Sequence, residues 1–456
     1  MSKDLSLEFL GAAGTVTGSK YLLTCGNKKV LIDCGLFQGL KSLRLKNWDG
    51  FPIDASEIDS IILTHAHIDH SGFIPRLIKK GFKGKIYSTS ATKDVSKILL
   101  PDCGYLLEEE AAYLNRIGRT KHSPALPLFT LKEAEDSLEY FVEVPFNKQL
   151  QISPELSFEF RYAGHILGAA SVIVNANGKR IGFTGDVGRM NDRMFYPPEP
   201  LPQIDYLVTE STYGNRLHEA IDPLDALEKI INEAYQQKGV IIIPAFAVGR
   251  AQTIMHYLAV LRRENRIPQM PMYLNSPMAT DFSAVFRKYK DLHKLSEVEC
   301  NEINAIVKFV RTPEESKALN ERKGPMLIIS ASGMLTGGRV LHHLKAFAPF
   351  PENTILLTGF QSAGTRGDAL QRGVKEIKIH GQYIEVNAEI KVLDNMSAHA
   401  DFGEIIQWFK QSKIHPKKVF VTHGESIAAD EFRRRLSEVF GWQCSVPDQA
   451  EKVWLE

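Results

Sequence analysis

Hydrophobic and polar residues alternate along much of the first 208 positions, which is the pattern of half-buried β-strands. Residues 5–10 show it plainly, because polar side chains separate Leu5, Leu7 and Phe9. Asn177-Gly178 between two later runs is typical of a tight hairpin turn. The predicted strands cover residues 5–10, 21–25, 29–33, 61–63, 85–87, 156–162, 171–174 and 180–184. With helices predicted at 71–80 and 91–116, an α/β domain of largely antiparallel sheets is expected.

The pattern changes after residue 210, where unbroken apolar strands alternate with helices. Asp222 and Pro223 are typical of a helix N-cap followed by proline at the first helical position. The strands expected here are 240–243, 271–274, 326–329 and 354–357, and the helices are 223–239, 250–263, 281–289 and 340–347. Such alternation indicates a doubly wound, mostly parallel sheet.

From about residue 385 the chain is predicted to return to the first kind of structure, with a strand at 390–393, a helix at 402–411, a strand at 418–422 and a helix at 428–440. The candidate functional residues flank the parallel region on both sides. We therefore expect a discontinuous domain made of residues 1–208 and 381–456, interrupted by a second domain at 209–380.

The composition is ordinary for a globular enzyme, with 44% hydrophobic and 24% charged residues. The net charge of +1 argues against a basic polyanion-binding tail, although a local basic groove remains open. The longest apolar stretch, residues 240–248, is too short to span a bilayer. Five scattered cysteines without CxxC spacing, and no signal-peptide pattern, predict a cytoplasmic protein without a membrane partner.

Metal-ligand chemistry is concentrated in one short segment, His65-Ala-His67-Ile-Asp69-His70, directly after the predicted strand 61–63. Histidine and carboxylate are the usual ligands of hydrolytic zinc, and four ligands within six residues can face two adjacent ions. A lone histidine would be a weak signal, but this spacing predicts a dinuclear metal site.

Three further residues stand at or just beyond predicted strand ends: His165, Asp186 and His423. Each taken alone is more typical of a hydrogen-bonded loop residue. Together they supply two more imidazoles and a carboxylate, and strand ends on one edge of a sheet sandwich can converge on one point.

Two glycine-rich turns are candidates for positioning a phosphate. Ser332 and Gly333 lie between a predicted apolar strand and a helix, where main-chain N–H groups can cradle an anion. Arg366 lies in the second turn as a candidate phosphate contact, and Phe360 is either a stacking face or a core residue. Such turns are equally typical of purely geometric connections. No Gly-Lys-Ser/Thr follows, so nucleotide hydrolysis is not predicted.

With these residues, the chain resembles the metallo-β-lactamase superfamily and, within it, the β-CASP nucleases, which include RNase J and the nuclease subunit of pre-mRNA 3′-end cleavage. The His-x-His-x-Asp-His segment matches the superfamily signature, and Asp33 in Leu-Ile-Asp-Cys-Gly matches its preceding structural aspartate. Glu210 in Thr-Glu-Ser-Thr-Tyr-Gly, His399 in Ser-Ala-His-Ala-Asp and His423 in Thr-His-Gly-Glu match the branch. The resemblance implies an αββα sandwich with an inserted α/β β-CASP domain.

The resemblance also implies roles by position, with two zinc ions as the cofactor. Asp33 would orient ligand groups from outside the coordination sphere. The ligands fall into two sets with one shared member: His65, His67 and His165 for the first metal, Asp69, His70 and His423 for the second, and Asp186 for both.

Two metal ions bridged by Asp186 and a water would lower the pKa of that water and supply hydroxide for attack on phosphorus. His399 would then protonate the leaving oxygen as general acid, and Glu210 would orient and charge it. Asp69 is counted with the catalytic groups, and Ser397 is a candidate substrate contact beside His399.

The resemblance favours RNA over DNA, because the DNA-processing branch usually has an aliphatic residue at the position of His423. The expected function is zinc-dependent hydrolysis of single-stranded RNA, and a homodimer is left open. One alternative is a hydrolase of a small thioester, lactone or phosphoester, although such relatives generally lack the inserted domain. A non-catalytic RNA-binding subunit is another, although all seven ligands are present. Endonuclease and 5′-exonuclease action both remain open.

Overall fold

A computed structural model describes residues 5–118 and 122–456, and the chain divides into two units. Unit 1 consists of Met1–Leu217 and His399–Glu456, and unit 2 of His218–Ala398. Unit 1 is therefore built from both ends of the chain, and unit 2 is an uninterrupted segment between them.

Unit 1 contains two seven-stranded sheets. The first sheet has the order β22 (Lys452–Trp454), β1 (Leu5–Phe9), β2 (Tyr21–Cys25), β3 (Lys28–Ile32), β4 (Ser60–Ile62), β5 (Lys85–Ser88) and β6 (Phe141–Glu143). The second has the order β21 (Cys444–Ser445), β20 (Lys418–Val421), β11 (Tyr206–Thr209), β10 (Lys179–Phe183), β9 (Ala170–Ala176), β8 (Leu156–Tyr162) and β7 (Leu150–Ser153).

The prediction of largely antiparallel sheets was wrong for half of each sheet. Strands β3 to β6 pair in parallel, as do β10, β11, β20 and β21. Only the other halves, which are rich in hairpins, are antiparallel. The parallel pairs are joined by long crossover connections, and a sequence pattern shows strands but not which partner each strand will take.

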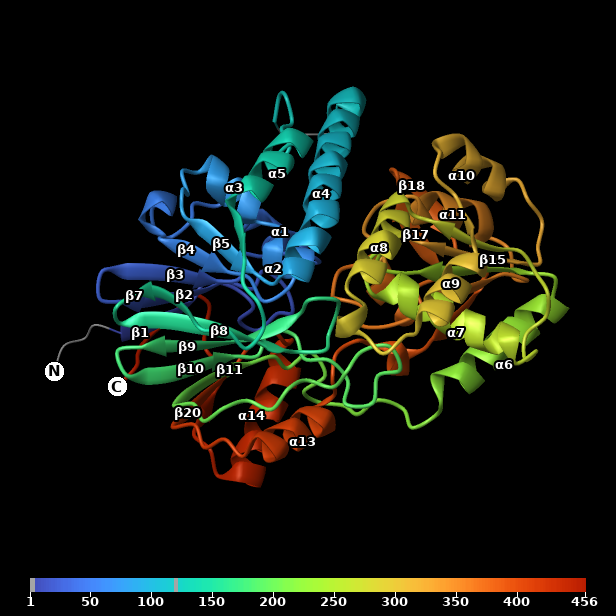
Figure 1. Cartoon of the computed structure of the whole chain (residues 1–456). Helices are drawn as coiled ribbons and strands as arrows, with labels where there is room; N and C mark the ends of the chain where they lie inside the picture. Colours follow the sequence, from blue (N-terminus) through green and yellow to red (C-terminus); the bar gives the residue numbers. More distant parts are fainter. Residues whose placement is uncertain (1–4, 119–121) are drawn as a thin grey trace. The chain divides into compact units, whose positions relative to one another are not determined.

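The two sheets of unit 1 pack face to face over an apolar core that includes Phe9, Phe158, Phe160 and Phe420. The outer face of the first sheet is covered by α3 (Ile74–Lys79), α4 (Ser90–Ile117) and α5 (Leu131–Ser137), and that of the second by α13 (Phe402–Ser412) and α14 (Ser426–Phe440). Figure 1 shows these helices on opposite sides of the paired sheets. The result is the expected αββα sandwich.

Two helices take the place of the single one predicted over 71–80, namely α2 (Ile68–Ser71) and α3. The break falls where the N–H of Phe73 donates to the carbonyl of Cys34 at 2.9 Å, and the N–H of Cys34 donates to the carbonyl of His70 at 2.7 Å. These bonds fasten the segment to the loop after β3, so a turn of the chain is fixed beside His70.

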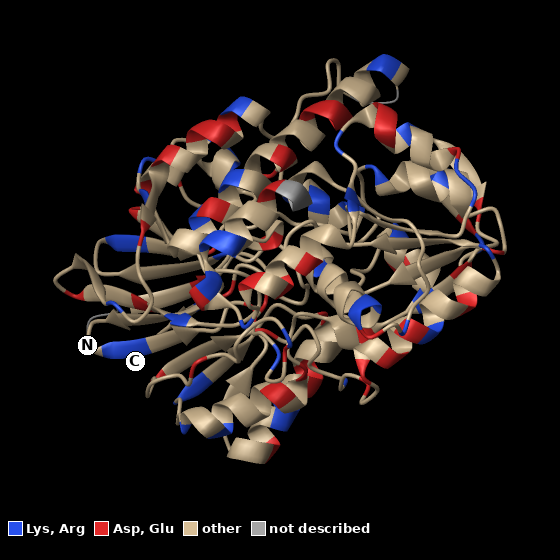
Figure 2. Ribbon diagram, turned by 45° about the vertical axis from the view of Figure 1, so that its right-hand side comes forward, with Lys and Arg blue, Asp and Glu red and all other residues tan. Residues whose placement is uncertain are grey.

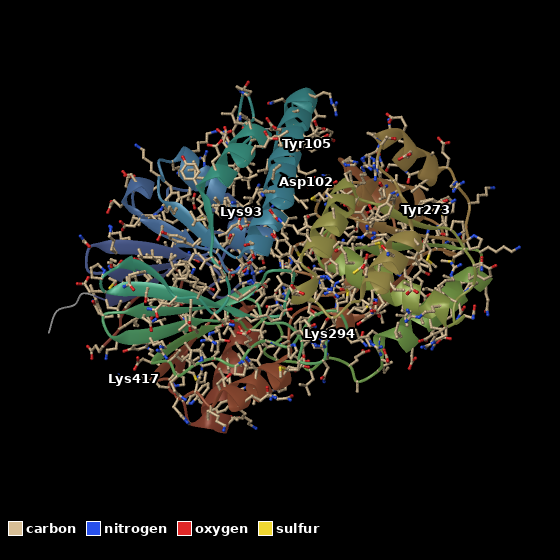
Figure 3. The ribbon with its side chains drawn as sticks, in the orientation of Figure 1. Lys93, Asp102, Tyr105, Tyr273, Lys294 and Lys417 are labelled. Atoms are coloured by element: carbon tan, nitrogen blue, oxygen red, sulfur yellow. The ribbon has the colours of Figure 1, made fainter. Side chains whose placement is uncertain are left out.

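Helix α4 shows how local sequence sets the ends of an element. Thr89 caps its start by accepting a hydrogen bond from the N–H of Thr92, and Gly118 ends it with a left-handed φ of 59°. Asp102 and Tyr105 lie on this helix (Figure 3), and Tyr105 is 50% exposed, so only one side of α4 packs on the sheet.

Unit 2 is a doubly wound α/β domain, as the alternation of apolar strands and helices predicted. Every strand pair of its six-stranded sheet is parallel. The order is β14 (Lys308–Phe309), β13 (Met272–Asn275), β15 (Met326–Ser330), β12 (Val240–Pro244), β16 (Thr354–Leu357) and β19 (Glu389–Val392). The helices are α6 (Pro223–Gln236), α7 (Arg250–Arg263), α8 (Pro277–Lys288), α9 (Glu297–Ala305), α10 (Pro313–Asn320), α11 (Val340–Phe347) and α12 (Arg366–Gln371).

One strand predicted for the returning segment belongs to unit 2 instead. Strand β19, expected at 390–393, pairs in parallel with β16 at the edge of this sheet. Before it, β17 (Glu376–Ile379) and β18 (Gln382–Glu385) form a separate antiparallel hairpin. The chain thus leaves unit 2 only just before His399.

Acidic and basic residues are interspersed along the helices and loops, as Figure 2 shows, in keeping with the net charge of +1. Among the described residues, no helix is both long and apolar enough to cross a membrane.

The core between the two sheets of unit 1 makes a direct prediction for Phe158, which is fully buried and packs against Tyr87 and Phe160. Phe158→Ala should lower the free energy of unfolding by about 3–5 kcal/mol, measured by urea denaturation. Tyr105→Ala, on the exposed side of α4, should change it by less than about 0.5 kcal/mol. Equal effects of the two variants would contradict this description of the core.

Candidate metal centre

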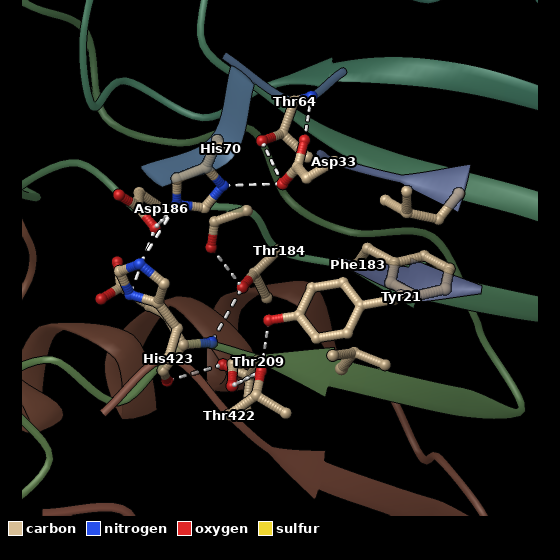
Figure 4. A pocket seen from close by; sticks show the side chains of 14 residues that line it. Tyr21, Asp33, Thr64, His70, Phe183, Thr184, Asp186, Thr209, Thr422 and His423 are labelled. Carbon is tan, nitrogen blue, oxygen red and sulfur yellow. Dashed lines mark hydrogen bonds and ion pairs between the residues drawn. The ribbon is translucent and has the colours of Figure 1, made fainter. Parts of the chain in front are cut away.

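The site residues of unit 1 follow the carboxyl ends of neighbouring parallel strands. Asp33 follows β3, His65 follows β4, Asp186 follows β10, Glu210 follows β11 and His423 follows β20. Parallel strands bring their carboxyl ends to the same edge of a sheet, so loops distant in sequence meet there. Figure 4 shows Asp33, His70, Asp186 and His423 around one pocket at this edge.

The first group of potential ligands is formed by His65, His67, His165 and Asp186. Nδ1 of His67 lies 3.1 Å from Nε2 of His65 and 3.2 Å from Nε2 of His165. One oxygen of Asp186, Oδ2, lies 3.4 Å from Nε2 of His65 and 3.5 Å from Nε2 of His165. Ligands bound tetrahedrally to zinc at about 2.0–2.1 Å are separated by about 3.3–3.4 Å, so these spacings fit a four-coordinate ion.

The second group is formed by Asp69, His70 and His423. Nε2 of His423 lies 3.1 Å from Nε2 of His70 and 3.5 Å from Oδ2 of Asp69. The other oxygen of Asp186, Oδ1, lies 3.1 Å from Nε2 of His70. Asp186 therefore presents one oxygen to each group, which is the geometry of a carboxylate shared by two cations.

The protonation states of the potential ligands also suit bound cations. Neither carboxylate oxygen of Asp186 has a hydrogen-bond partner among the described residues, although the side chain is buried. Burial lowers the pKa of His65 to about 3 and that of His67 to about 4, which leaves neutral rings with a free lone pair. Burial opposes ionisation of Asp186, but the surrounding histidines hold its pKa well below the usual range. The neutral imidazoles of His65 and His67 and the ionised carboxylate of Asp186 suit a divalent metal.

Asp33 contacts the ligands from behind. Its Oδ2 lies 2.7 Å from Nδ1 of His70 and accepts a hydrogen bond from the hydroxyl of Thr64 at 2.9 Å, while its Oδ1 accepts one from the N–H of Thr64 at 2.8 Å. A proton on Nδ1 of His70 is thereby held toward Asp33, so Nε2 is free to bind a metal. The orienting role of Asp33 stays a prediction, and this contact is the one through which it would act.

Two threonines make the same kind of contact and were missed by the sequence reasoning. The hydroxyl of Thr64 lies 3.1 Å from Nδ1 of His65, and that of Thr212 lies 3.2 Å from Nδ1 of His423. Thr212 stands two residues after Glu210. The only signal in the sequence is that each threonine lies in a segment that also carries a site residue, because Thr64 directly precedes His65.

His399 and Glu210 form a pair beside Asp186. Nδ1 of His399 lies 3.0 Å and 3.2 Å from the two carboxylate oxygens of Glu210. Glu210 is 1% exposed, and its carboxylate also accepts a hydrogen bond from the N–H of Val187 at 2.6 Å. Nε2 of His399 lies 3.9 Å from Oδ2 of Asp186. Burial disfavours the charged imidazole, but Glu210 and Asp186 outweigh it and raise the pKa of His399 to about 9. A protonated imidazole thus turns Nε2 toward the candidate metal site.

The four candidate substrate contacts, Ser332, Gly333, Arg366 and Ser397, all lie in unit 2. The hydroxyl of Ser332 accepts hydrogen bonds from the N–H groups of its own turn at Thr336 and Gly337. Arg366 donates to the carbonyls of Lys378 and Leu335, at 2.7 and 2.9 Å. These contacts favour a role in holding the turn, and phosphate binding by Arg366 stays a prediction.

The other two candidates are enclosed by neighbouring groups. Gly333 is buried, and a Cβ atom there would lie 2.9 Å from the ring of Phe246. Ser397 is 4% exposed, and its N–H donates to the carbonyl of Asp394 at 3.0 Å. Their roles in binding substrate also stay predictions.

Three family models match the chain in succession. The metallo-beta-lactamase superfamily model matches residues 13–231, the Beta-Casp domain model matches 251–370, and the Zn-dependent metallo-hydrolase RNA specificity domain model matches 383–447. The last of these stretches contains His399 and His423.

Two characterised proteins are similar over most of the chain. Ribonuclease TTHA0252 of Thermus thermophilus is 32% identical over 423 residues, which cover 91% of this chain and 92% of the relative. Transcription termination factor FttA of Methanosarcina mazei is 31% identical over 451 residues, which cover 94% of this chain and 68% of the relative. Among solved structures, a protein of unknown function from Enterococcus faecalis covers 99% of this chain and all of its own, with a TM-score of 0.53. At 13% identity that similarity shows a shared fold alone.

The metal centre makes a prediction for stability. Removing metal with a chelator should lower the melting temperature and added zinc should restore it, because an ion that binds only the folded state stabilises it by about 2.7 kcal/mol at a hundred times its Kd. Asp186→Ala should melt at the same temperature with and without the chelator. A wild-type melting temperature indifferent to chelator and zinc would contradict the assignment.

Proposed function

The chain belongs to the β-CASP branch of the metallo-β-lactamase superfamily, and we propose that it is a zinc-dependent ribonuclease that hydrolyses phosphodiester bonds of single-stranded RNA. The observation that carries the proposal is the shared carboxylate of Asp186 between two groups of buried ligands, with the His399–Glu210 pair beside it. The similarity to a ribonuclease over nearly its full length supports RNA as the substrate.

Two zinc ions would be held by the two groups of ligands, with Asp186 between them. Bound there, they supply Lewis acidity toward the phosphate and make a water molecule acidic enough to attack near neutral pH. Asp69 belongs to the second group, and its side chain is 20% exposed.

His399 supplies the proton for the leaving group. Water gives up one proton to solvent and attacks phosphorus as hydroxide. A new P–O bond forms as the bond from phosphorus to the ribose oxygen breaks. That oxygen takes its proton from Nε2 of His399, whose other nitrogen contacts Glu210 and keeps the ring oriented and charged. His399 is 17% exposed in its side chain, which is open enough to reach a substrate.

RNA is favoured over a small substrate by two observations. The model matched by residues 383–447 is described as an RNA specificity domain, and His423, which favours RNA within the β-CASP resemblance, lies in it. Unit 2 is a complete α/β domain that small-substrate relatives generally lack.

Cytoplasmic location and a homodimer belong to the same proposal. All five cysteines are free, which suits a reducing compartment. The homodimer stays a prediction, and the molar mass of the purified protein measured by light scattering would test it.

A direct test uses end-labelled linear RNA and circular RNA with the zinc-loaded protein. Wild type should cut linear RNA, and His399→Ala should retain its metal yet lose about 100-fold or more in kcat, as expected for loss of a general acid. Cutting of circles identifies an endonuclease, and stepwise release of mononucleotides identifies an exonuclease. Hydrolysis of a thioester or lactone without any cutting of RNA would overturn the proposal.

The pairing of Glu210 with His399 predicts a shift in pH dependence. The negative charge of Glu210 raises the pKa of His399, so Glu210→Gln should lower that pKa. Because the general acid acts only when protonated, the alkaline limb of kcat/KM should move to lower pH in this variant. Glu438→Gln, an exposed change on α14, should leave the limb in place. An unmoved limb in Glu210→Gln would remove His399 as the acid.

A further inference from the structure

The loop that joins β1 to β2, residues 11–18 (the β1–β2 loop), lies at the same edge of the first sheet as the metal centre. Strand β1 is antiparallel to β2, which is antiparallel to β3, so β1 ends at the edge where β3 and β4 end. The loop and the residue that follows it, Ser19, are tied to two ligand segments. The N–H of His423 donates to the carbonyl of Ala12 at 2.8 Å, and the N–H of Ser19 donates to the carbonyl of Asp69 at 2.9 Å.

The main-chain N–H groups of the β1–β2 loop have no acceptor in the described parts of the protein. None from Gly11 to Gly18 donates to a backbone or side-chain oxygen, although Ala12 is fully buried and Thr17 is 2% exposed. A buried N–H without an acceptor is unfavourable, and native proteins rarely leave one unmatched. Left-handed φ angles at Ala12 (54°), Gly14 (65°) and Gly18 (79°) interrupt the run, a backbone pattern that turns successive N–H groups toward an anion.

A buried positive charge stands at the end of the same loop. Lys20 is 4% exposed, its ammonium lies 4.3 Å from the ring centre of Phe37, and it donates to the carbonyl of Gly18 at 3.2 Å. No carboxylate pairs with it among the described residues. Burial lowers the pKa of Lys20 to about 8, which an anion nearby would counteract.

Close packing explains why glycine stands at two positions of this loop, but it does not explain the other features. A Cβ atom at Gly11 would lie 1.7 Å from the carbonyl oxygen of Gly18, and one at Gly18 would overlap the ring of Phe37. Those two glycines are needed for close approach. Packing does not account for the unmatched N–H groups or for a buried ammonium that has aromatic and carbonyl contacts but no described carboxylate partner, and both of these favour an anion.

We propose that the β1–β2 loop and Lys20 form a binding site for a phosphate of the RNA backbone next to the phosphate being cleaved. The assignment rests on the proposed ribonuclease function for the identity of the anion. Ala13, Gly14 and Thr15 are partly exposed and would present their N–H groups to the phosphate, while Lys20 would contribute its charge from the end of the loop, where it contacts Gly18. Ties to Asp69 and His423 place this subsite beside the second group of ligands.

The test compares three variants of the zinc-loaded full chain. Thr15→Glu adds a carboxylate to the loop, and Lys20→Met removes the buried charge at nearly constant length. Asn27→Glu adds the same carboxylate to the exposed β2–β3 turn, at the opposite end of β2, and is the matched control. Binding of a phosphorothioate single-stranded RNA is measured by fluorescence anisotropy at several KCl concentrations, and zinc content and melting temperature are measured in parallel.

Thr15→Glu should raise the Kd for RNA about tenfold or more, because it places like charges together, and Asn27→Glu should change it less than about twofold. Lys20→Met should reduce the slope of log K against log salt by about 0.7, the value for one phosphate contact on a single strand. Loss of kcat/KM in Thr15→Glu should be about tenfold larger with RNA than with bis(p-nitrophenyl) phosphate, which has no neighbouring phosphate.

Wild-type affinity and salt slope in both loop variants would overturn the subsite. Equal losses with RNA and with bis(p-nitrophenyl) phosphate would also overturn it, because the loop would then act on the metal centre. Failure of the ribonuclease proposal looks different: wild type would bind RNA without cutting it, and the comparison of Kd values among the variants would still decide the subsite.

Discussion

Asp186 is buried with histidine nitrogens of both ligand groups within 3.5 Å of its two oxygens, and neither oxygen has a hydrogen-bond partner among the described residues. A buried carboxylate in such surroundings is stable only if positive charge compensates it. Divalent cations bound among these nitrogens would provide that charge. The need to bring these groups together explains much of unit 1, because none of them could be buried here alone.

The parallel halves of the two sheets meet this need. Each contributes loops from the carboxyl ends of its strands, and β20 brings His423 to His70 across 353 residues of sequence. Contacts outside the ligand set then fix the two sides together: the hydroxyls of Tyr21 and Thr422 lie 3.0 Å apart, and the N–H of His423 donates to Ala12. The C-terminal segment of the chain is thus part of the site as well as of the fold.

Much of the fold could be predicted from local pattern. Helices at 250–263 and 340–347 and the strand at 354–357 match the structure to the residue, because the spacing of their apolar residues defines them locally. Strand partners could not be predicted, since pairing depends on distant segments; the parallel pairs of unit 1 and the placement of β19 beside β16 show this.

Part of the candidate site could likewise be predicted from the sequence, and part could not. His65, His67, Asp69 and His70 are recognisable from spacing alone, and the residues at later strand ends from their position and from the resemblance. Thr64 and Thr212 could not be found, because a hydroxyl that orients a histidine has no signature apart from its neighbours in space. The N–H groups of residues 11–18 carry no side-chain signal at all, and only the folded backbone reveals them.

The most direct test of this account is a crystal structure of the zinc-loaded protein with anomalous data collected on both sides of the zinc edge. Two anomalous peaks are expected, one among His65, His67 and His165 and one among Asp69, His70 and His423, with the carboxylate of Asp186 between them. A single peak, or none, at saturating zinc would contradict it.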